Sequence, residues 1–227
     1  MRINKLFSNY GICSRKETNK LIEEGRITVN GEKCIAGQWV ELSDIILLDG
    51  KEIEEKEKIY IALNKPRGIV CTASEMKDNN IIQYLGLNQY VFPIGRLDKD
   101  SQGLIILTND GELANKVLEA ENNHEKEYIV TLDKEFTDDF IENMEKGVEI
   151  LGRITKPCKL KRIDERTYSI ILTQGLNRQI RRMSKVFGYN VVKLERIRII
   201  NIILDDLEYG KWRYISEDEI SKLIAEF

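Results

Sequence analysis

Two carboxylates in a polar loop are the first residues of this sequence whose types and spacing fit catalysis. Asp98 and Asp100 lie within Pro93–Leu104, a segment that has a glycine near each end and runs into an apolar stretch. Loops held by rigid strands often carry catalytic groups. Residues two apart face the same way only in an extended chain, so the pair predicts either a carboxylate site or turn formers.

A stretch rich in arginine predicts a helix with two different faces. Over residues 175–187, a 3.6-residue period places Ile180, Met183 and Phe187 together on an apolar face. The opposite face collects four cations: Arg178, Arg181, Arg182 and Lys185. Because these charges repel one another, the face needs carboxylates or phosphates opposite it, and planar guanidinium groups suit both. A purely structural role is the alternative.

A second basic helix is predicted near the N-terminus. Ser14 and Glu17 form a capping box, so a helix begins at Ser14, and Gly25 ends it. Lys16 and Lys20 are like charges four residues apart, which destabilises an isolated helix unless an anion lies opposite. The surface that we expect around this helix also includes Arg2, Lys5, Arg15, Arg26 and Lys33. Charges that serve only solubility are the alternative.

The distribution of charge points to an anionic partner, although the average does not. With 35 basic and 38 acidic residues the net charge is −3. Between Arg153 and Arg198, thirteen Lys and Arg residues face only three acids, whereas from Asp205 to Phe227 seven acids outnumber three bases. This asymmetry predicts a basic groove that binds phosphates and is backed by an acidic surface. Solvated charge without a partner is the other interpretation.

Composition excludes several classes of chemistry. The single histidine, His124, has no neighbouring ligand set, which argues against histidine triads and zinc hydrolases. The cysteines lack the pairing of a zinc site or a disulfide scaffold: Cys13, Cys34, Cys71 and Cys158. An enzyme of this composition would rely on carboxylate, tyrosine and arginine. No apolar run approaches the roughly 18 residues of a membrane helix, so we expect a cytoplasmic protein.

The first fifty residues read as a compact unit of two short helices and a small sheet. Ile27–Val29 leads into the hairpin turn Asn30–Gly31, and Ile45–Leu48 ends at a second turn, Asp49–Gly50. The charged stretch Glu52–Lys58 suits an exposed connector. We therefore expect a domain over residues 1–52, a linker over 53–58 and a second domain over 59–227.

The second domain alternates strand-like and helix-like patterns. Strands are predicted at Ile59–Leu63, Leu104–Thr108, Tyr128–Leu132, Tyr168–Leu172 and Val191–Val192. Helices are predicted near 79–85, 111–119, 137–146, 177–187 and 217–226. Variable spacing without a repeat favours an α+β fold with a largely antiparallel sheet over a doubly wound fold.

Three N-terminal segments resemble a known RNA-binding module. Arg2-Ile3-Asn4-Lys5-Leu6, Cys13-Ser14-Arg15-Lys16 and Gly25–Gly31 are similar to the αL domain found in ribosomal small-subunit protein four. The likeness spans about fifty residues. It implies binding to structured RNA and nothing more specific.

The rest of the chain resembles the RsuA family of pseudouridine synthases, and most closely its large-subunit synthase F branch. The resemblance rests on Leu63–Gly68, Gly95-Arg96-Leu97-Asp98, Lys126-Glu127-Tyr128 and Gly175–Met183. Cys71 and Gln102 depart from the commoner serine and glutamate, which weakens the branch assignment but not the activity. The resemblance implies isomerisation of uridine to pseudouridine in structured RNA, without cofactor or metal.

The resemblance also implies roles for individual residues. Asp98 is the essential residue, as nucleophile or base toward the ribose; Tyr128 stacks near the target base and helps to move the C5 proton. Arg181 pairs with Asp98, unless a different helix phase brings Arg178 or Arg182 closer. A free aspartate is ionised near neutral pH, and an adjacent arginine favours that form.

Further residues are implied as RNA contacts. The uridine must be extruded from its stack at a cost of a few kcal/mol, and Arg96 is expected to fill the gap. Lys65 and three residues of the basic helix complete the expected RNA contacts: Arg178, Arg182 and Lys185. The expected RNA is that of the large ribosomal subunit, bound by a monomer. Alternatives are a synthase acting on transfer RNA or small-subunit RNA, and a non-catalytic RNA-binding or ribosome-associated protein.

Overall fold

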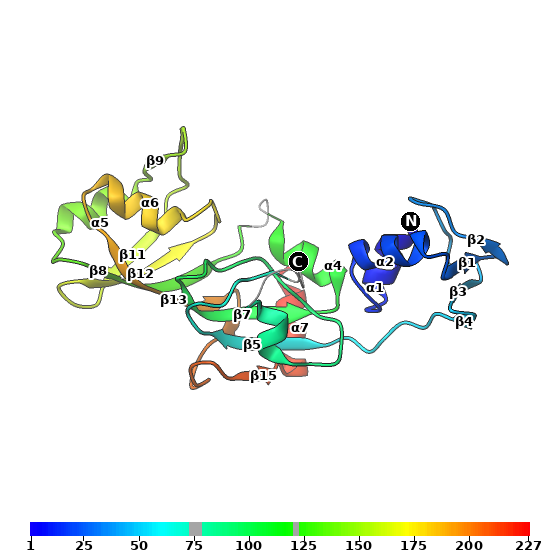
Figure 1. Ribbon diagram of the computed structural model, residues 1–227. Helices are drawn as coiled ribbons and strands as arrows, with labels where there is room; N and C mark the ends of the chain where they lie inside the picture. Colours follow the sequence, from blue (N-terminus) through cyan, green and yellow to red (C-terminus); the bar gives the residue numbers. More distant parts are fainter. Residues whose placement is uncertain (73–78, 120–122) are drawn as a thin grey trace.

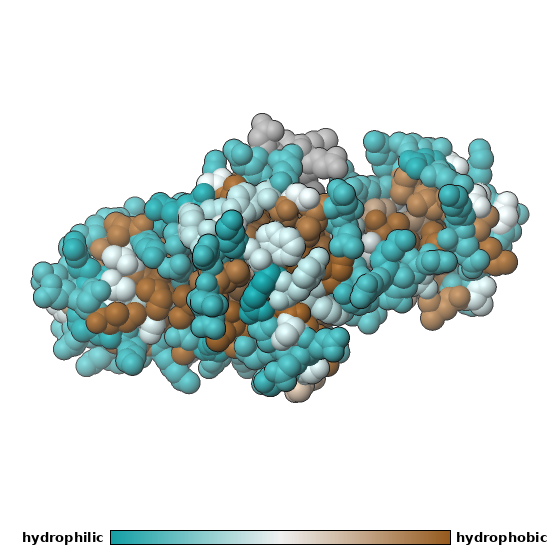
Figure 2. Space-filling model, turned by 90° about the horizontal axis from the view of Figure 1, so that it is seen from below, coloured by the Kyte–Doolittle hydropathy of each residue, from teal (hydrophilic) through white to brown (hydrophobic). Residues whose placement is uncertain are grey.

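The chain folds into a small N-terminal domain and a larger domain on a long sheet, in a computed structural model that describes residues 1–72, 79–119 and 123–227. Figure 1 shows an elongated molecule with the N-terminal domain at one end and helices α5 and α6 at the other. Hydrophilic residues extend over both domains on the face in Figure 2, with apolar patches between them. The architecture is the predicted α+β fold.

The N-terminal domain packs two helices on a four-stranded sheet in the order β2-β1-β3-β4. Its helices are α1 (Ile3–Asn9) and α2 (Arg15–Glu23). Its strands are β1 (Ile27–Val29), β2 (Glu32–Lys33), β3 (Ile46–Leu48) and β4 (Lys51–Glu52). The predicted helices and hairpins of this region are therefore confirmed.

Local sequence signals build this domain as predicted. The side chain of Ser14 accepts from the amide of Glu17, and the Glu17 carboxylate accepts from the amide of Ser14 at 2.7 Å, which completes the capping box. Asn30 and Gly31 have φ values of 52° and 86°. These left-handed conformations are those of the tight hairpin turn that Asn-Gly favours.

Asn109 holds the connector between the two domains. Its side chain accepts a hydrogen bond from the amide of Ile59 (2.9 Å) and donates one to the carbonyl of Glu57 (2.8 Å). The Lys58 ammonium donates to the carbonyl of Asn9, the last residue of α1, at 2.7 Å. The connector between the domains is therefore held by specific hydrogen bonds.

The larger domain is built on a nine-stranded sheet. Its main path runs β11-β12-β8-β13-β7-β5-β15, with β14 paired to β13 and β6 paired to β7. The strands are β5 (Tyr60–Lys65), β6 (Phe92–Pro93), β7 (Gln102–Thr108), β8 (Lys126–Leu132), β11 (Lys159–Arg162), β12 (Thr167–Leu172), β13 (Val191–Ile199), β14 (Ile202–Ile203) and β15 (Trp212–Tyr214). A separate hairpin pairs β9 (Glu149–Ile150) with β10 (Arg153–Ile154). All five predicted strands are present.

The five predicted helices of this domain are also confirmed: α3 (Ile81–Leu85), α4 (Gly111–Leu118), α5 (Asp138–Glu145), α6 (Gln179–Val186) and α7 (Glu217–Ala225). One strand was predicted too short. β13 continues to Ile199 because its charged residues have partners: the Arg198 guanidinium lies 3.0 Å from Glu127 and 2.9 Å from Glu125. Paired charges thus occupy a central strand.

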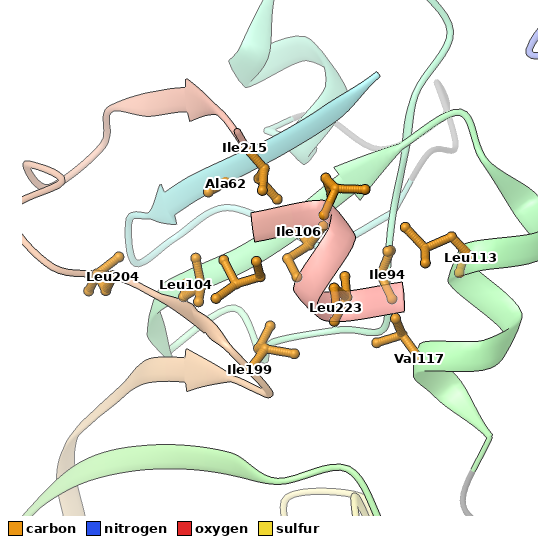
Figure 3. Close-up of a cluster of buried hydrophobic side chains, with 13 residues drawn as sticks. Ala62, Ile94, Leu104, Ile106, Leu113, Val117, Ile199, Leu204, Ile215 and Leu223 are labelled. Atoms are coloured by element: carbon orange, nitrogen blue, oxygen red, sulfur yellow. The ribbon is translucent and has the colours of Figure 1, made fainter. Parts of the chain in front are cut away.

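Separate hydrophobic cores pack against the two halves of the sheet. One core packs β5 and β7 against α4 and α7, with Ile106 and Leu223 completely buried (Figure 3). Another packs β8 and β12 under α5 and α6, around Tyr168 and Met183. The two halves of the sheet thus have different cores, and β13 contributes Ile199 to the first and Leu194 to the second.

The halves meet where β7 runs parallel to β13, through the pairs Gln102 with Glu195 and Gly103 with Arg196. Gly103 has a φ of 101°, and an added Cβ would lie 2.3 Å from the carbonyl oxygen of Arg196. Only glycine permits this close approach. Gly103 therefore allows β7 to join the other half of the sheet.

Candidate active site

Asp98 lies in a tight turn just before β7. The amide of Ser101 donates to the carbonyl of Asp98 at 3.0 Å, which closes the turn. The amide of Gly68 donates to the carbonyl of Lys99 at 2.7 Å and ties the turn to the segment after β5. The Asp98 side chain is 32% exposed. It is thus fixed by backbone bonds yet open to a ligand.

The arginine nearest Asp98 is Arg178, at 3.4 Å between Nη1 and Oδ2. Arg178 is the N-cap of α6 and has a left-handed backbone with φ of 50°. Its guanidinium also donates two hydrogen bonds to Asp100, at 3.0 and 3.1 Å. These bonds raise the pKa of Arg178 and lower that of Asp100. Both carboxylates of the loop thus share one guanidinium.

The expectation that Arg181 pairs with Asp98 is wrong. Its guanidinium donates to the carbonyl of Val191 (2.8 Å), the carbonyl of Asp100 (3.2 Å) and the hydroxyl of Ser101 (3.3 Å). The side chain is only 13% exposed, and burial lowers its pKa. Arg181 is therefore not part of an exposed stripe of cations. It holds the turn that contains Asp98 against β13.

The predicted apolar face of α6 is present, since Ile180 and Met183 are buried and Phe187 packs against the same core. Arg178 lies before the helix rather than within it, because α6 begins at Gln179. The wheel that placed Arg178 beside Arg181 therefore fails at the first turn, and the two side chains have different environments.

Asp98, Tyr128 and Arg178 line one pocket between the two halves of the sheet. The pocket is open to solvent at its mouth, and its cavity volume is about 120 Å³. Tyr128 comes from β8, and the buried Arg196 guanidinium lies 6.0 Å from the centre of its ring. An acid, an aromatic ring and a cation from three elements therefore converge on one open pocket.

The other predicted cations near the pocket differ in exposure. Arg96 is exposed and lines the pocket. Arg182 is exposed but donates to the backbone and side-chain oxygens of Asn177, each at 3.0 Å. Lys185 is exposed on α6. All three are available to RNA at the surface, and Arg182 would share its guanidinium with Asn177.

Lys65 cannot contact RNA as expected, because its side chain is completely buried. Its ammonium donates to the carbonyls of Pro66 and Ile69, both at 2.9 Å. Burial lowers its pKa, while the nearby Asp100 and Asp98 oppose that shift. Lys65 thus holds the segment after β5 in place from within the fold.

Two cations of the central strands were not singled out from the sequence: Lys126 of β8 and Arg196 of β13. Arg196 is 3% exposed and donates from Nε to the carbonyl of Leu104 at 2.7 Å. The pKa of Lys126 is lowered to about 8, mainly because the side chain is buried and to a smaller extent because the positive charge of Arg196 lies nearby. Lys126 entered only as part of the motif Lys126-Glu127-Tyr128, and Arg196 only as one of the thirteen Lys and Arg residues between Arg153 and Arg198. Arg196 pairs with β7 and β8, and Lys126 pairs with β12 and β13. Such pairing is a tertiary feature that no local pattern predicts.

The predicted basic surface of the N-terminal domain is exposed. Arg2, Lys5, Arg15 and Lys16 are all exposed. Lys20 lies 3.8 Å from Glu24, and Arg26 donates from Nε to Asp49 at 2.8 Å. Arg26 is thus partly neutralised inside the domain.

Within the described ranges, no three His, Cys, Asp or Glu side chains cluster as a metal site would require. No helix in those ranges is both long and apolar enough to cross a bilayer.

Comparison with known proteins identifies the family. The family model described as RNA pseudouridylate synthase matches residues 59–185, more than half of the chain. The chain belongs to the RNA pseudouridine synthase family. A second family model, the S4 domain, matches residues 1–46 of this pseudouridine synthase. The predicted RNA-binding domain is therefore an S4 domain.

Full-length relatives agree with this assignment. The synthase is 50% identical over 98% of its length, and over 78% of the relative, to the dual-specificity RNA pseudouridine synthase RluF of Salmonella typhi. It is 34% identical to the ribosomal large subunit pseudouridine synthase B of Bacillus subtilis, over 99% of this chain and 96% of that one. A crystal structure of a pseudouridylate synthase matches with a TM-score of 0.72 and 29% identity, covering 98% and 99% of the two chains.

Proposed function

We propose that this pseudouridine synthase modifies uridine in large-subunit ribosomal RNA and that Asp98 is its catalytic carboxylate. The observation that carries the proposal is the pocket that Asp98, Tyr128 and Arg178 line together. These side chains come from the turn before β7, from β8 and from the N-terminus of α6. Catalytic groups that converge on a concave site from separate elements are the expected arrangement of an active site.

The reaction is an isomerisation that requires one carboxylate and no oxidant or reductant. The bond between N1 of uracil and C1′ of ribose breaks, the base rotates, and a bond forms between C5 and C1′. The proton on C5 is lost, and N1 ends with a proton. Asp98 acts on the ribose as nucleophile or as base, and the Arg178 guanidinium lies 3.4 Å from its carboxylate. Tyr128 stacks on the detached base and helps to move the C5 proton.

Access to the pocket requires an everted nucleotide, because the reacting C1′ of a stacked uridine lies inside the RNA helix. Arg96 lines the pocket and is exposed, so it is placed to occupy the vacated stack. Phosphates near the everted nucleotide are held by Arg178, which lines the pocket, and by Arg182 and Lys185, which are exposed on α6. The helix α2 surface binds the same RNA farther away, through Arg2, Lys5, Arg15, Lys16, Lys20 and Arg26.

Large-subunit RNA is favoured as the substrate because the Bacillus subtilis relative is named for that subunit. The RluF relatives are named as dual-specificity enzymes, which keeps transfer RNA and small-subunit RNA as second candidates. A non-catalytic RNA-binding protein is disfavoured because Asp98, Tyr128 and the arginines line an open pocket.

Mapping of pseudouridine in all cellular RNA tests the proposal. Cells that lack the gene should lose pseudouridine at one or more positions of large-subunit RNA, and the wild-type gene should restore them. The Asp98→Asn gene should not. If the Asp98→Asn gene restored pseudouridine, Asp98 would not be the catalytic residue. If pseudouridine were lost only from transfer RNA or small-subunit RNA, that RNA would be the substrate instead.

The proposal includes a functional division of the chain. We place RNA docking in residues 1–52, a linker in 53–58 and catalysis in 59–227. We further propose that a cytoplasmic monomer acts on RNA, without metal or cofactor. Sedimentation of the purified protein with and without RNA measures its oligomeric state, and activity after dialysis against a chelator measures any need for metal.

A further inference from the structure

Asp100 is a second carboxylate at the active site to which the reaction assigns no task. It lies two residues after Asp98 in the same turn, and its side chain is 41% exposed. The pocket that Asp98 lines does not include Asp100 among its lining residues. Asp100 thus stands beside the reacting space without facing it.

The contacts of Asp100 are all with the arginines of the α6 region. Its two carboxylate oxygens accept from the two terminal nitrogens of Arg178, at 3.0 and 3.1 Å. Nη2 of Arg181 lies 3.5 Å from the same carboxylate. A bidentate hydrogen bond between a carboxylate and a guanidinium fixes both the distance and the orientation of the guanidinium.

Arg178 depends on this bond for its position. It precedes the first residue of α6, has a left-handed backbone, and makes no capping bond with its side chain. Its contact with Asp98 involves one nitrogen at 3.4 Å, which is longer than either bond to Asp100. A long side chain that is 41% exposed would otherwise sample many rotamers.

We propose that Asp100 is a positioning residue, which holds the guanidinium of Arg178 against Asp98 and does not touch the substrate. The inference rests on the proposed catalytic role of Asp98. The turn itself does not need the Asp100 side chain, since its bonds run through the backbone: Ser101 donates to the carbonyl of Asp98, and Arg181 to the carbonyl of Asp100. Substitution of Asp100 should therefore leave the fold intact.

The test compares Asp100→Asn with Asp100→Glu, Arg178→Gln and the double variant Asp100→Asn with Arg178→Gln. Asparagine keeps the size of the side chain but turns an amide donor toward the guanidinium. We expect kcat to fall about 10- to 100-fold, the cost of a misplaced active-site group, while KM changes less than about threefold. Glutamate should recover part of kcat, and the double variant should be no slower than Arg178→Gln alone.

Two outcomes would overturn the inference: a wild-type kcat for Asp100→Asn, or effects of the two single substitutions that multiply in the double variant. A crystal structure of Asp100→Asn gives a test that is independent of activity. Displacement of Arg178 from Asp98 supports the inference, and an unmoved guanidinium refutes it. If wild-type protein formed no pseudouridine, the proposed function would fail, while the structure would still decide the role of Asp100.

Discussion

The cations of helix α2 and those around the pocket differ in what already binds them. The side chains of Arg15 and Lys16 are exposed and make no hydrogen bond or ion pair with any residue in the described ranges. Arg178 and Arg181 instead both donate to Asp100, the first to its carboxylate and the second to its carbonyl. A free cation attracts any phosphate within reach, whereas an engaged guanidinium has one position. The first arrangement suits binding, and the second suits chemistry at a fixed point.

Substitution of Asp98 should separate the two regions most strongly. Asp98→Asn keeps the turn, which is closed through backbone atoms, but removes the nucleophile or base. We expect the rate of pseudouridine formation to fall about a thousandfold or more, with the dissociation constant for RNA changed less than about threefold. Single-turnover kinetics and filter binding on the same RNA measure both. A parallel loss of binding would mean that the pocket itself anchors the RNA.

Substitution of Arg181 tests whether an engaged arginine serves the fold. In Arg181→Gln the oxygens of Val191, Asp100 and Ser101 lose a shared donor. We expect the free energy of unfolding to fall by about 1–3 kcal/mol, the cost of leaving such groups unsatisfied. Denaturation in urea measures it.

Arg182→Gln is the matched control, because Arg182 is exposed one residue further along α6. It should change the free energy of unfolding by less than about 0.5 kcal/mol. Equal effects of the two substitutions would contradict the bracing role of Arg181.

The ion pair of Arg213 with Glu219 provides a reference far from either RNA region. Arg213 donates to Glu219 at 2.7 and 2.8 Å and lowers its pKa from 4.5 to about 2. The ionised carboxylate therefore stabilises the fold above about pH 4.5, and this contribution is lost as the pH falls toward 2. Glu219→Gln should lower the free energy of unfolding by about 1 kcal/mol at pH 7.

Denaturation at several pH values measures this effect, which should shrink below pH 4.5, the ordinary value for the group. Glu226→Gln, at an exposed position after the same helix, is the control and should have no such dependence. RNA binding should be unchanged in both. An effect of Glu219→Gln that stays constant down to pH 2 would show that the pair does not stabilise the fold electrostatically.

Prediction from sequence succeeded where local signals decide the structure. The capping box at Ser14, the turn at Asn30 and the periodicity around Ile180 each act within a few residues, and the structure has them all. The residues expected at the chemical centre, Asp98 and Tyr128, also line one pocket.

The failures occur where distant segments decide. Lys65 was expected to contact RNA, but it lies in β5 opposite Gly103 of β7 and is completely buried. The resemblance placed Arg181 beside Asp98, with Arg178 or Arg182 as alternatives. The guanidinium of Arg181 instead donates to the carbonyl of Val191 on β13, and Arg178 is the arginine that lies nearest Asp98. Strands such as β14 and β15 have two or three residues, too few for a pattern. Their pairing depends on the neighbouring strand.

The smallest expected effect concerns two lysines of α2: Lys16, which is unpaired within the described ranges, and Lys20, which lies 3.8 Å from Glu24. Lys16→Ala combined with Lys20→Ala should weaken RNA binding about three- to tenfold, or about 1 kcal/mol. It should also flatten the dependence of log K on log salt by about 1–2, because each lost phosphate contact removes ~0.7–0.9. Turnover of bound RNA should not change, since neither residue lines the pocket.

The control for this last prediction is Lys222→Ala, which removes a cation that pairs with Asp218 on α7 at 2.6 Å. It should leave the salt dependence as it is in the wild type. If the α2 double variant kept the wild-type slope, its lysines would not touch phosphate. If it lowered turnover of bound RNA instead, the S4 domain would be setting the geometry of the pocket, and the separation between free and engaged cations would not hold.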